Sequence, residues 1–202
     1  MQTQLKPITK YEAKWADQLP SKRSRQYQHS RGCVRDALSN LWGVPALEIP
    51  LNAPPGNSPE LLDGWGHISF SHCCDGLFIG WSSSRIGVDL ERSDRSFKAN
   101  RLIKRYFSQQ EKEALSHLSG EDLRTAVLKQ WVAKEAAIKW QRGTLAANIS
   151  QWSLCKNSNQ AIHKSIGHKI GLHYLCYQSW YMAIAFDSNI HKHSPIICNH
   201  WT

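Results

Sequence analysis

The chain lacks the long apolar runs that a secretion signal or a membrane span requires. No stretch of the 202 residues approaches membrane-spanning length, and the segment that follows Met1 has no apolar core of the kind found in signal peptides. These absences predict a cytoplasmic protein that does not bind a membrane.

Cysteine motifs for metal binding are also missing. The six cysteines include no Cys-x-x-Cys pair and no zinc-finger spacing. Adjacent Cys73 and Cys74 point to opposite faces of an extended chain, so they suit neither one metal ion nor an easy disulfide. We expect free thiols in a reducing compartment.

Acidic residues are scarce relative to basic ones. The chain has 16 Asp and Glu against 25 Lys and Arg, which gives a net charge of +9. This excess predicts an anionic substrate or partner, such as nucleic acid, an acidic protein or a phosphorylated cofactor. No helix-turn-helix, zinc-finger or aromatic RNA-binding signature is visible, which argues against nucleic acid.

Helix and strand signals occur in both halves of the chain. The first half has a basic helix over 21–38, a loop rich in proline, glycine and asparagine over 50–59, and strands over 66–72, 77–81 and 86–91. The second half has helices over 99–107, 109–117 and 122–141, with Gly143 as the cap, and strands over 151–154, 161–166, 172–177 and 181–186. Close spacing and turn chemistry favour antiparallel hairpins. We therefore expect an α+β fold of two similar units, residues 1–95 and 96–202, each with antiparallel strands packed against helices.

The predicted strand over 86–91 carries the first candidate site. Its apolar side chains share one face, whereas Gly87, Asp89 and Glu91 share the other. The two carboxylates project together about 7 Å apart at the backbone, which is two strand rises. A hard divalent cation such as magnesium relieves the repulsion between them. An isolated Asp-x-Glu is also common on the exposed polar face of a strand.

The helix over 122–141 carries a third carboxylate, Glu135. At about 100° per residue, Glu135 lies about 40° from Trp131 and therefore on the apolar stripe of the helix. A carboxylate on the buried side must be paired, protonated or bound to a metal ion. Two interpretations stay open: a ligand shared with the strand carboxylates, or a buried salt bridge to Lys134 or Lys139.

Basic and polar residues could complete an anion site around these carboxylates. Lys139, one helical turn after Glu135, could reach the same ligand. Ser71 and His72 end a strand beside a turn and could donate to a phosphate, although a lone histidine is more often structural. The basic helix near the amino terminus is a solvated face on its own but a candidate phosphate clamp beside a metal site. Its residues are Lys22, Arg23, Arg25 and Arg31.

Four segments carry the most specific pattern in the chain. They are Ser-Phe-Ser-His at 69–72, Ile-Gly-Val-Asp-Leu-Glu at 86–91, Tyr-Phe-Ser-Gln-Gln-Glu at 106–111 and Trp-Val-Ala-Lys-Glu-Ala-Ala-Ile-Lys at 131–139. In order and separation, over roughly residues 65 to 155, the chain resembles the 4′-phosphopantetheinyl transferases, most of all the larger single-chain type. It departs from that family at Cys73, where a second serine is frequent. After Gln151 it is similar only in general character.

The resemblance implies two α+β halves related by pseudo-two-fold symmetry, with coenzyme A in the cleft between them. It implies magnesium, or manganese, bound by Asp89, Glu91 and Glu135. It assigns catalysis to Glu135, as the base, and to Lys139. The phosphate contacts that it implies are Lys134, Lys139, Ser71 and His72, with Lys22, Arg23 and Arg31 at the 3′-phosphate. Glu111 matches an acidic position near the carrier-protein side.

We therefore expect a monomeric enzyme that moves the phosphopantetheine arm of coenzyme A to a serine of an apo acyl or peptidyl carrier protein and releases 3′,5′-ADP. Carrier protein and coenzyme A are the expected partners, without nucleic acid. Two alternatives are a basic nucleic-acid-binding protein and a magnesium-dependent nuclease. The usual nuclease signature, Asp followed by Glu-x-Lys, is missing after Asp89, because the only Glu-x-Lys is Glu12-Ala13-Lys14.

Overall fold

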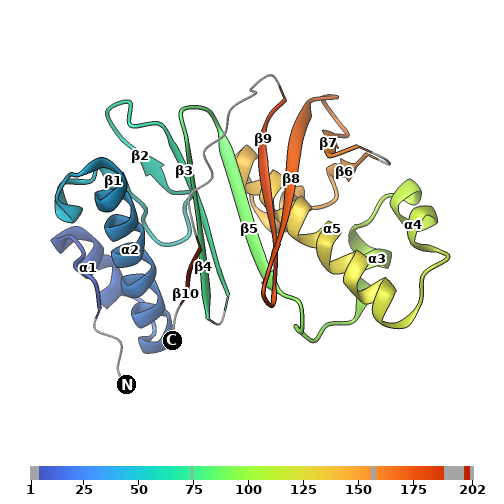
Figure 1. Ribbon diagram of the computed structural model, residues 1–202, viewed down its shortest axis with the longest axis horizontal. Helices are drawn as coiled ribbons and strands as arrows, with labels where there is room; N and C mark the ends of the chain where they lie inside the picture. Colours follow the sequence, from blue (N-terminus) through green and yellow to red (C-terminus); the bar gives the residue numbers. More distant parts are fainter. Residues whose placement is uncertain (1–4, 74, 156–157, 189–197, 201–202) are drawn as a thin grey trace.

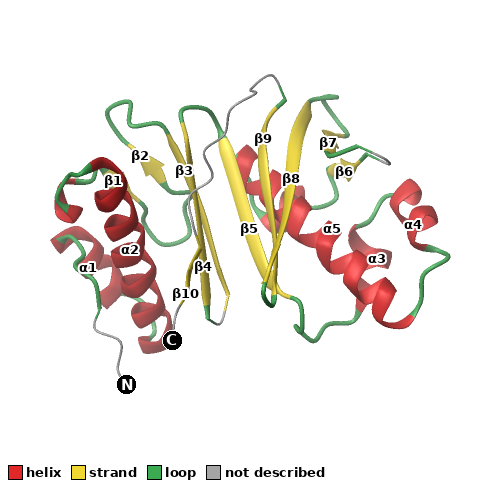
Figure 2. Cartoon of the chain, viewed as in Figure 1, coloured by secondary structure: helices red, strands yellow, loops and turns green. Residues whose placement is uncertain are grey.

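The computed structural model describes residues 5–73, 75–155, 158–188 and 198–200. Helices and antiparallel sheets are combined in both halves of the chain (Figures 1 and 2). The expected α+β class is thereby confirmed. The pseudo-two-fold relation between the halves stays a prediction.

The amino-terminal part contributes two helices and four strands. In chain order these are α1 (Lys10–Asp17), α2 (Ser21–Trp42), a 3-10 turn (Ala46–Glu48), β1 (Leu51–Asn52), β2 (Glu60–Leu61), β3 (His67–Cys73) and β4 (Gly76–Ser82). Strands β3 and β4 form the antiparallel hairpin that the turn chemistry predicts, with His67 opposite Ser82. α2 packs against this hairpin through Val34 and Leu38.

The remaining elements build a larger sheet and its helices. They are β5 (Ile86–Arg92), α3 (Ala99–Tyr106), α4 (Gln109–Leu115), α5 (Gly120–Gln141), α6 (Leu145–Asn148), β6 (Trp152–Leu154), β7 (Gln160–His163), β8 (Lys169–Tyr177), β9 (Trp180–Asp187) and β10 (Cys198–His200). α5 covers this sheet through small side chains such as Ala133, Ala136 and Ala137. It ends at Arg142, which adopts a left-handed conformation at φ 60°, so the cap lies one residue before the expected Gly143.

The β3–β4 hairpin and β5 belong to different sheets, and the division of the chain at residue 95 stays a prediction. The described strands form sheets in the order β10-β4-β3 and β5-β9-β8-β7-β6, beside the short pair β1-β2. β5 therefore pairs with β9 instead of continuing the β3–β4 hairpin, and β10 returns to β4. The physical reason lies in β5 itself, because its first five residues are all buried and need cover on both faces.

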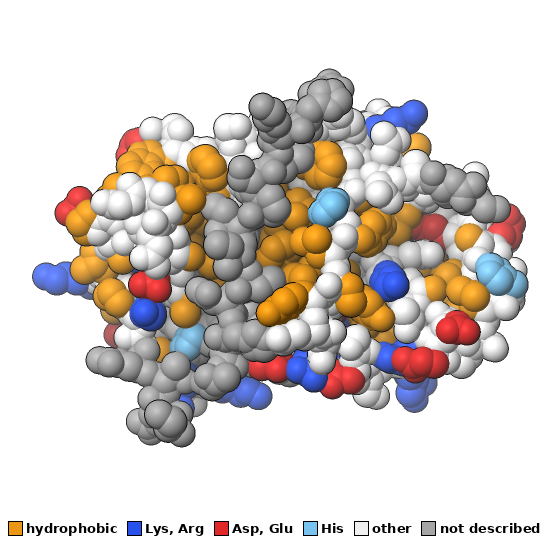
Figure 3. Space-filling model, in the orientation of Figure 1, with side chains coloured by type: hydrophobic (Ala, Val, Ile, Leu, Met, Phe, Trp, Pro, Cys, Tyr) orange, Lys and Arg blue, Asp and Glu red, His pale blue; other side chains and the backbone are white. Residues whose placement is uncertain are grey.

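Four layers follow one another across Figure 1: α2, the smaller sheet, the larger sheet and α5. Phe78 of β4 packs against Val88 of β5 and Ile184 of β9, so a third apolar cluster joins the two sheets. In the view of Figure 3, hydrophobic side chains gather over the region where Figure 1 places β5, β8 and β9. Among the described helices, none has the length and hydropathy needed to cross a bilayer.

The cysteines can be checked in part. Cys33, Cys155 and Cys176 are free thiols, as expected. Cys74 lies outside the described residues, so the expectation for the adjacent pair is not tested.

Candidate active site

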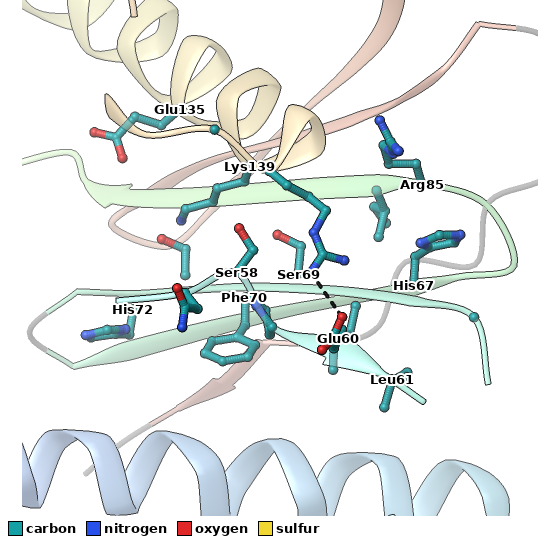
Figure 4. Close-up of a pocket in the computed structure, with 18 of the residues that line it drawn as sticks. Ser58, Glu60, Leu61, His67, Ser69, Phe70, His72, Arg85, Glu135 and Lys139 are labelled. Carbon is teal, nitrogen blue, oxygen red and sulfur yellow. Dashed lines mark hydrogen bonds and ion pairs between the residues drawn. The ribbon is translucent and has the colours of Figure 1, made fainter. Parts of the chain in front are cut away.

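A cleft of about 560 Å³ opens where the two sheets meet the carboxyl end of α5. Its walls come from β3, the start of β5, the last turns of α5 and the loop over 56–61. In Figure 4, Glu135 and His72 lie toward one end of this cleft, whereas Arg85 and His67 lie toward the other. The cleft therefore brings together side chains that are far apart in the sequence.

Gly87 allows β5 to approach α5 closely. A Cβ atom at this position would lie 2.1 Å from the Ala136 carbonyl oxygen and 2.3 Å from the Trp140 backbone nitrogen. No side chain fits in that space, because real carbon atoms do not approach backbone so closely. The absence of a side chain at Gly87 thus sets how near the β5 carboxylates come to the helix that carries Glu135 and Lys139.

Asp89 is the carboxylate that the surroundings hold most firmly. It is 2% exposed. Its Oδ1 atom accepts a hydrogen bond from Ser71 Oγ at 2.6 Å and lies 2.7 Å from Lys139 Nζ. Its Oδ2 atom is buried and has no hydrogen-bond partner among the described residues. A buried carboxylate oxygen normally has a partner, so Oδ2 is open to a donor or a cation.

Glu135 lines the cleft, and the negative charges of Asp89 and Glu91 act on the pKa of its carboxyl group. Burial, followed by the negative charge of Asp89, raises the pKa of Glu135 to about 8, while Lys139 acts in the opposite direction. Glu91 adds to the repulsion. The electrostatic influence of Asp89 and Glu91 on Glu135 places the three predicted carboxylates in one neighbourhood.

Glu91 lies at the outer side of this neighbourhood and forms an ion pair with Arg95. Burial raises the pKa of its carboxyl, Arg95 lowers it, and Asp89 raises it again. The side chain is half-buried rather than exposed. A polar strand face in open solvent, the alternative left by the sequence, does not describe this position.

Magnesium fits the chemistry of these donors. Three carboxylates that repel one another, one of them with a buried free oxygen, match the oxygen ligands that magnesium prefers. As the side chains stand, however, no three His, Cys, Asp or Glu of the described chain form a closed metal-binding group. Lys139 and Arg95 neutralise Asp89 and Glu91 in this arrangement. The magnesium site therefore remains a proposal.

Two serines of β3 point at β5. Ser69 Oγ accepts a hydrogen bond from the Val88 backbone nitrogen at 3.0 Å, and Ser71 holds Asp89. Alternation along β3 places His72 on the other side of the strand. His72 is exposed and also lines the cleft. Partial desolvation, Lys139 and Arg31 lower the pKa of its imidazole.

Lys134 is not among the described residues that line the cleft, and its expected phosphate contact stays a prediction. Its side chain is fully buried and lies 2.9 Å from the carboxylate of Glu111, and its amino group donates to the Trp152 carbonyl oxygen. Glu111 also accepts from the Ser108 and Leu154 backbone nitrogens at 2.6 and 2.9 Å. The pair therefore joins α4, α5 and β6, and Glu111 is buried.

The basic residues of α2 divide into two groups. Arg31 lines the cleft, but its guanidinium donates to the Ala53 carbonyl oxygen and to Ser30 and lies over the rings of Tyr27 and Phe70. Lys22 and Arg23 lie exposed in the first turn of α2 and are not among the described residues that line the cleft. The structure thus brings one of the three expected 3′-phosphate contacts to the site.

Four charged or titratable residues of the cleft were not predicted from the sequence: Arg85, Arg142, His67 and Glu60. Arg142 and Glu60 form an ion pair across the cleft at 3.3 Å. They are 82 positions apart in the sequence, so no local sequence pattern predicts this contact. The one available signal was the arginine directly after the predicted helix, beside Gly143.

Comparison with solved structures finds similar proteins, among them two holo-acyl-carrier-protein synthases of low sequence identity. One is a holo-(acyl-carrier-protein) synthase from Bacillus anthracis in complex with CoA (3′,5′-ADP), at 19% identity and a TM-score of 0.43, covering 52% of this chain and 97% of that one. The other is the holo-ACP synthase of Plasmodium yoelii, at 18% identity and a TM-score of 0.40, covering 56% and 98%. No curated protein matches the chain in sequence.

A family model gives the stronger result. The model of the 4′-phosphopantetheinyl transferase superfamily matches residues 85–189, about half of the chain. This range begins one residue before β5 and includes α5, so it contains Asp89, Glu91, Glu135 and Lys139. The β5 and α5 residues at and beside the cleft are thus inside the matched range, and the chain belongs to the 4′-phosphopantetheinyl transferase superfamily.

Proposed function

We propose that the chain is a magnesium-dependent transferase of the holo-acyl-carrier-protein synthase type. It would move the 4′-phosphopantetheine arm of coenzyme A to a serine of an apo acyl or peptidyl carrier protein. One observation carries the proposal: Asp89 of β5, Lys139 of α5 and Ser71 of β3 form one hydrogen-bonded group beside Glu135. Three elements hold these polar groups rigidly at one end of a cleft.

Asp89, Glu91 and Glu135 are the residues that would hold magnesium. Bound there, the cation would neutralise charge on the coenzyme A pyrophosphate. Ser71 keeps one Asp89 oxygen oriented, which leaves Oδ2 directed elsewhere. Lys139 is 30% exposed at its side chain, so it can contact Asp89 and a phosphate in the cleft together.

Glu135 would accept the proton of the carrier serine, directly or through a water molecule. The serine oxygen then bonds to the β-phosphorus, the atom that carries the pantetheine arm. The bond from that phosphorus to the bridging oxygen breaks, and 3′,5′-ADP leaves with the bridging oxygen. Lys139 would donate to the departing phosphate. Positioning and electrostatics supply most of the catalysis in such a transfer.

The positive charge of the chain supports an acidic partner. A net charge of +9 attracts an acidic carrier protein at long range and speeds its encounter with the enzyme. Raising the salt concentration should therefore increase KM for the carrier more than KM for coenzyme A, whose contacts lie inside the cleft. A carrier KM that does not respond to salt would exclude steering.

The direct test incubates the protein with coenzyme A, magnesium and an apo carrier protein, and measures the mass of the carrier. A gain of one phosphopantetheine is expected. Two controls should show no gain: a carrier whose acceptor serine is replaced by alanine, and a reaction with excess chelator. No mass gain with any of several acyl and peptidyl carriers would overturn the proposal.

A further inference from the structure

Helix α2 carries a row of polar side chains that bind the main chain of a neighbouring segment. Tyr27, Arg31 and Arg35 follow one another at four-residue intervals, which places them on one face of the helix. All three are buried. They donate to carbonyl oxygens of the segment over 46–53, which directly precedes the loop that forms the cleft wall over 56–61. This row of side chains therefore lies where α2 can control the shape of the cleft.

Arg35 binds three carbonyl groups and one carboxylate. Its Nη1 atom donates to the carbonyl oxygens of Ala46 and Ile49 at 3.1 and 2.8 Å, and its Nη2 atom donates to that of Leu51 at 3.1 Å. Its Nε atom donates at 2.8 Å to Glu12 of α1, the helix on the outer side of α2 in Figure 1. A planar guanidinium serves these partners together, whereas a lysine ammonium has fewer donors and no fixed plane.

The segment over 46–53 depends on such contacts because it has little regular structure. It contains a 3-10 turn over 46–48 and the two-residue strand β1. Ile49, Leu51 and Ala53 are buried. Buried main-chain carbonyl groups need hydrogen-bond partners, and a ladder this short supplies few of them. The side chains of α2 supply others, so the segment is held where α2 places it.

β1 transmits this position to the wall of the cleft. In the β1–β2 ladder, Leu51 lies opposite Leu61. Asn52 lies opposite Glu60 and also donates from its side-chain amide to Glu60 Oε1 at 2.6 Å. Glu60 and Leu61 both line the cleft, together with the residues over 56–59 that precede them. A shift of β1 would therefore move one wall of the cleft.

The orientation of Arg31, which lines the cleft, depends on the same segment. Its Nε and Nη2 atoms donate to the Ala53 carbonyl oxygen at 3.2 and 3.1 Å, and the Tyr27 hydroxyl donates to that oxygen at 2.9 Å. Ala53 stands two residues after Leu51, which Arg35 holds. Arg35 therefore acts on the cleft in two ways, through β1 and through the carbonyl group that orients Arg31.

We infer that Arg35 is a positioning residue for coenzyme A binding: held by Glu12, it fixes the segment over 46–53 and thereby the cleft wall over 56–61 and the orientation of Arg31. The inference rests on the proposed function. Arg35 and Glu12 are 2% and 1% exposed and are not among the described residues that line the cleft, so coenzyme A would touch neither. Any effect of Arg35 on binding must therefore pass through the main chain that it holds.

The test compares two variants that disturb the same buried ion pair in different ways. Arg35→Lys keeps a cation beside Glu12 but loses the planar set of donors to the carbonyl groups. Glu12→Gln removes the charge of the carboxylate but leaves those donors in place. Asp36→Asn is the matched control, because Asp36 is the next residue of α2 and forms its ion pair near the surface, with Lys6.

Affinity for coenzyme A is measured by calorimetry, below the temperature at which any variant unfolds. Arg35→Lys and Glu12→Gln should both lower the unfolding temperature, because each weakens a buried ion pair. Arg35→Lys should also raise Kd about tenfold, the lower end of the loss found when residues that orient ligands at metal sites are changed. Glu12→Gln and Asp36→Asn should leave Kd near its original value.

Two further readouts locate the effect. In the transfer assay, Arg35→Lys should raise KM for coenzyme A and leave kcat near its original value, because the proposed catalytic groups lie on β5 and α5. Amide hydrogen exchange needs no coenzyme A. The Leu62 backbone nitrogen, directly after the cleft wall, donates to the Pro50 carbonyl oxygen at 3.0 Å. Its exchange should become faster in Arg35→Lys than in Glu12→Gln, because only the first variant releases the segment.

Three outcomes would contradict the inference, and they are distinguishable. If Glu12→Gln raises Kd as much as Arg35→Lys does, the effect follows stability and Arg35 has no positioning role. If folded Arg35→Lys binds coenzyme A with the original Kd while the unmodified protein transfers the arm, the inference is wrong and the proposed function stands. If the unmodified protein neither binds coenzyme A nor transfers the arm, both fall together.

A milder variant decides the matter if Arg35→Lys does not fold. Tyr27→Phe conserves volume and removes one of the donors to the Ala53 carbonyl oxygen. It should raise Kd for coenzyme A about threefold, within the range for a neutral hydrogen bond. An unchanged Kd for this variant would overturn the inference, because the position of the segment would then not affect binding.

Discussion

Two lysine–carboxylate pairs lie on different sides of α5, and they differ in how far the lysine is exposed. Lys139 pairs with Asp89 at 2.7 Å, and Lys134 pairs with Glu111 at 2.9 Å. The residue types and distances are nearly the same. The surroundings differ: the Lys139 side chain is 30% exposed, whereas Lys134 is fully buried.

The carboxylates of the two pairs also differ in how completely they are satisfied. Both oxygens of Glu111 accept hydrogen bonds from backbone nitrogens, in addition to the contact with Lys134. Asp89 keeps one buried oxygen without a partner in the described chain. A saturated pair holds helices together, whereas an unsaturated pair beside a cleft can still bind a ligand. Lys134 and Glu135, adjacent residues of one motif, thus differ in their surroundings: Lys134 belongs to the saturated pair, whereas Glu135, for which we propose a chemical role, faces the cleft.

The largest effect on activity should come from a change beside the pair of Asp89 and Lys139, at Glu135. We expect Glu135→Gln to reduce transfer to the carrier by about 10²- to 10⁴-fold, the usual range for loss of an acid–base group. Urea unfolding should show equal or greater stability, because one of three mutually repelling carboxylates is gone. Transfer within threefold of the original rate would remove Glu135 from the chemistry and weaken the contrast with Lys134.

A change to the buried pair of Lys134 and Glu111 should lower the stability of the protein instead of its activity. Lys134→Met leaves Glu111 as a buried charge without its cation, which costs about 3–5 kcal/mol of unfolding free energy. KM for coenzyme A should not change, when measured under conditions where the variant is folded. Adding Glu111→Gln should recover part of the loss, because the two effects are coupled. A raised KM with unchanged stability would return Lys134 to the phosphate site.

The spacing between β5 and α5 should affect the pair of Asp89 and Lys139 more than the pair of Lys134 and Glu111. Gly87→Ala should cost about 1–3 kcal/mol of stability, as overpacking does, because the new Cβ meets helix backbone at 2.1 Å. Transfer should fall further than stability predicts, since Asp89 is two residues away. Gly143→Ala is the matched control, because the three atoms nearest to its Cβ would all belong to the Asn148 side chain instead of to backbone. Equal losses for both variants would show that the spacing has no special role.

The smallest effect should follow from Ser71→Ala. This change removes one of two donors to Asp89 Oδ1 and leaves Lys139 in place. About 1.5 kcal/mol, or roughly tenfold in kcat, is expected, which is the lower end of the range for a hydrogen bond to a charged group. Ser69→Ala, which loses the contact with the Val88 backbone instead, should affect stability more than kcat. The reverse pattern would show that Ser71 does not orient the carboxylate.

Helical periodicity predicted burial near Glu135 but could not identify the partners. On the wheel, Lys134 lies about 60° from Trp131 on one side and Glu135 about 40° on the other, so both are near the stripe. What separates them is the position of Glu111, 23 residues earlier. Burial of Glu111 could have been predicted from the sequence, because Ser108 and Glu111 form a capping box that holds the Glu111 side chain against the start of α4.

Strand positions were predictable from alternation and turn residues, whereas strand partners were not. The hairpin of β3 and β4 follows from the Asp75-Gly76 turn. The pairing of β5 with β9 depends on burial of both β5 faces, which only the assembled layers provide. The Arg142–Glu60 contact likewise joins loops and helix ends that no local rule relates.

The seam between the two sheets has a consequence for how the protein could move. β3 and β5 are edge strands of different sheets, and the Ser69 and Ser71 hydroxyl groups connect them. A hydroxyl can rotate and find a new partner, whereas a backbone ladder resists sliding along its length. Sliding of one sheet past the other would therefore change the donor at Asp89 while each sheet keeps its own ladder. The exchange rate of the Val88 amide proton would report how often the contact with Ser69 opens during that motion.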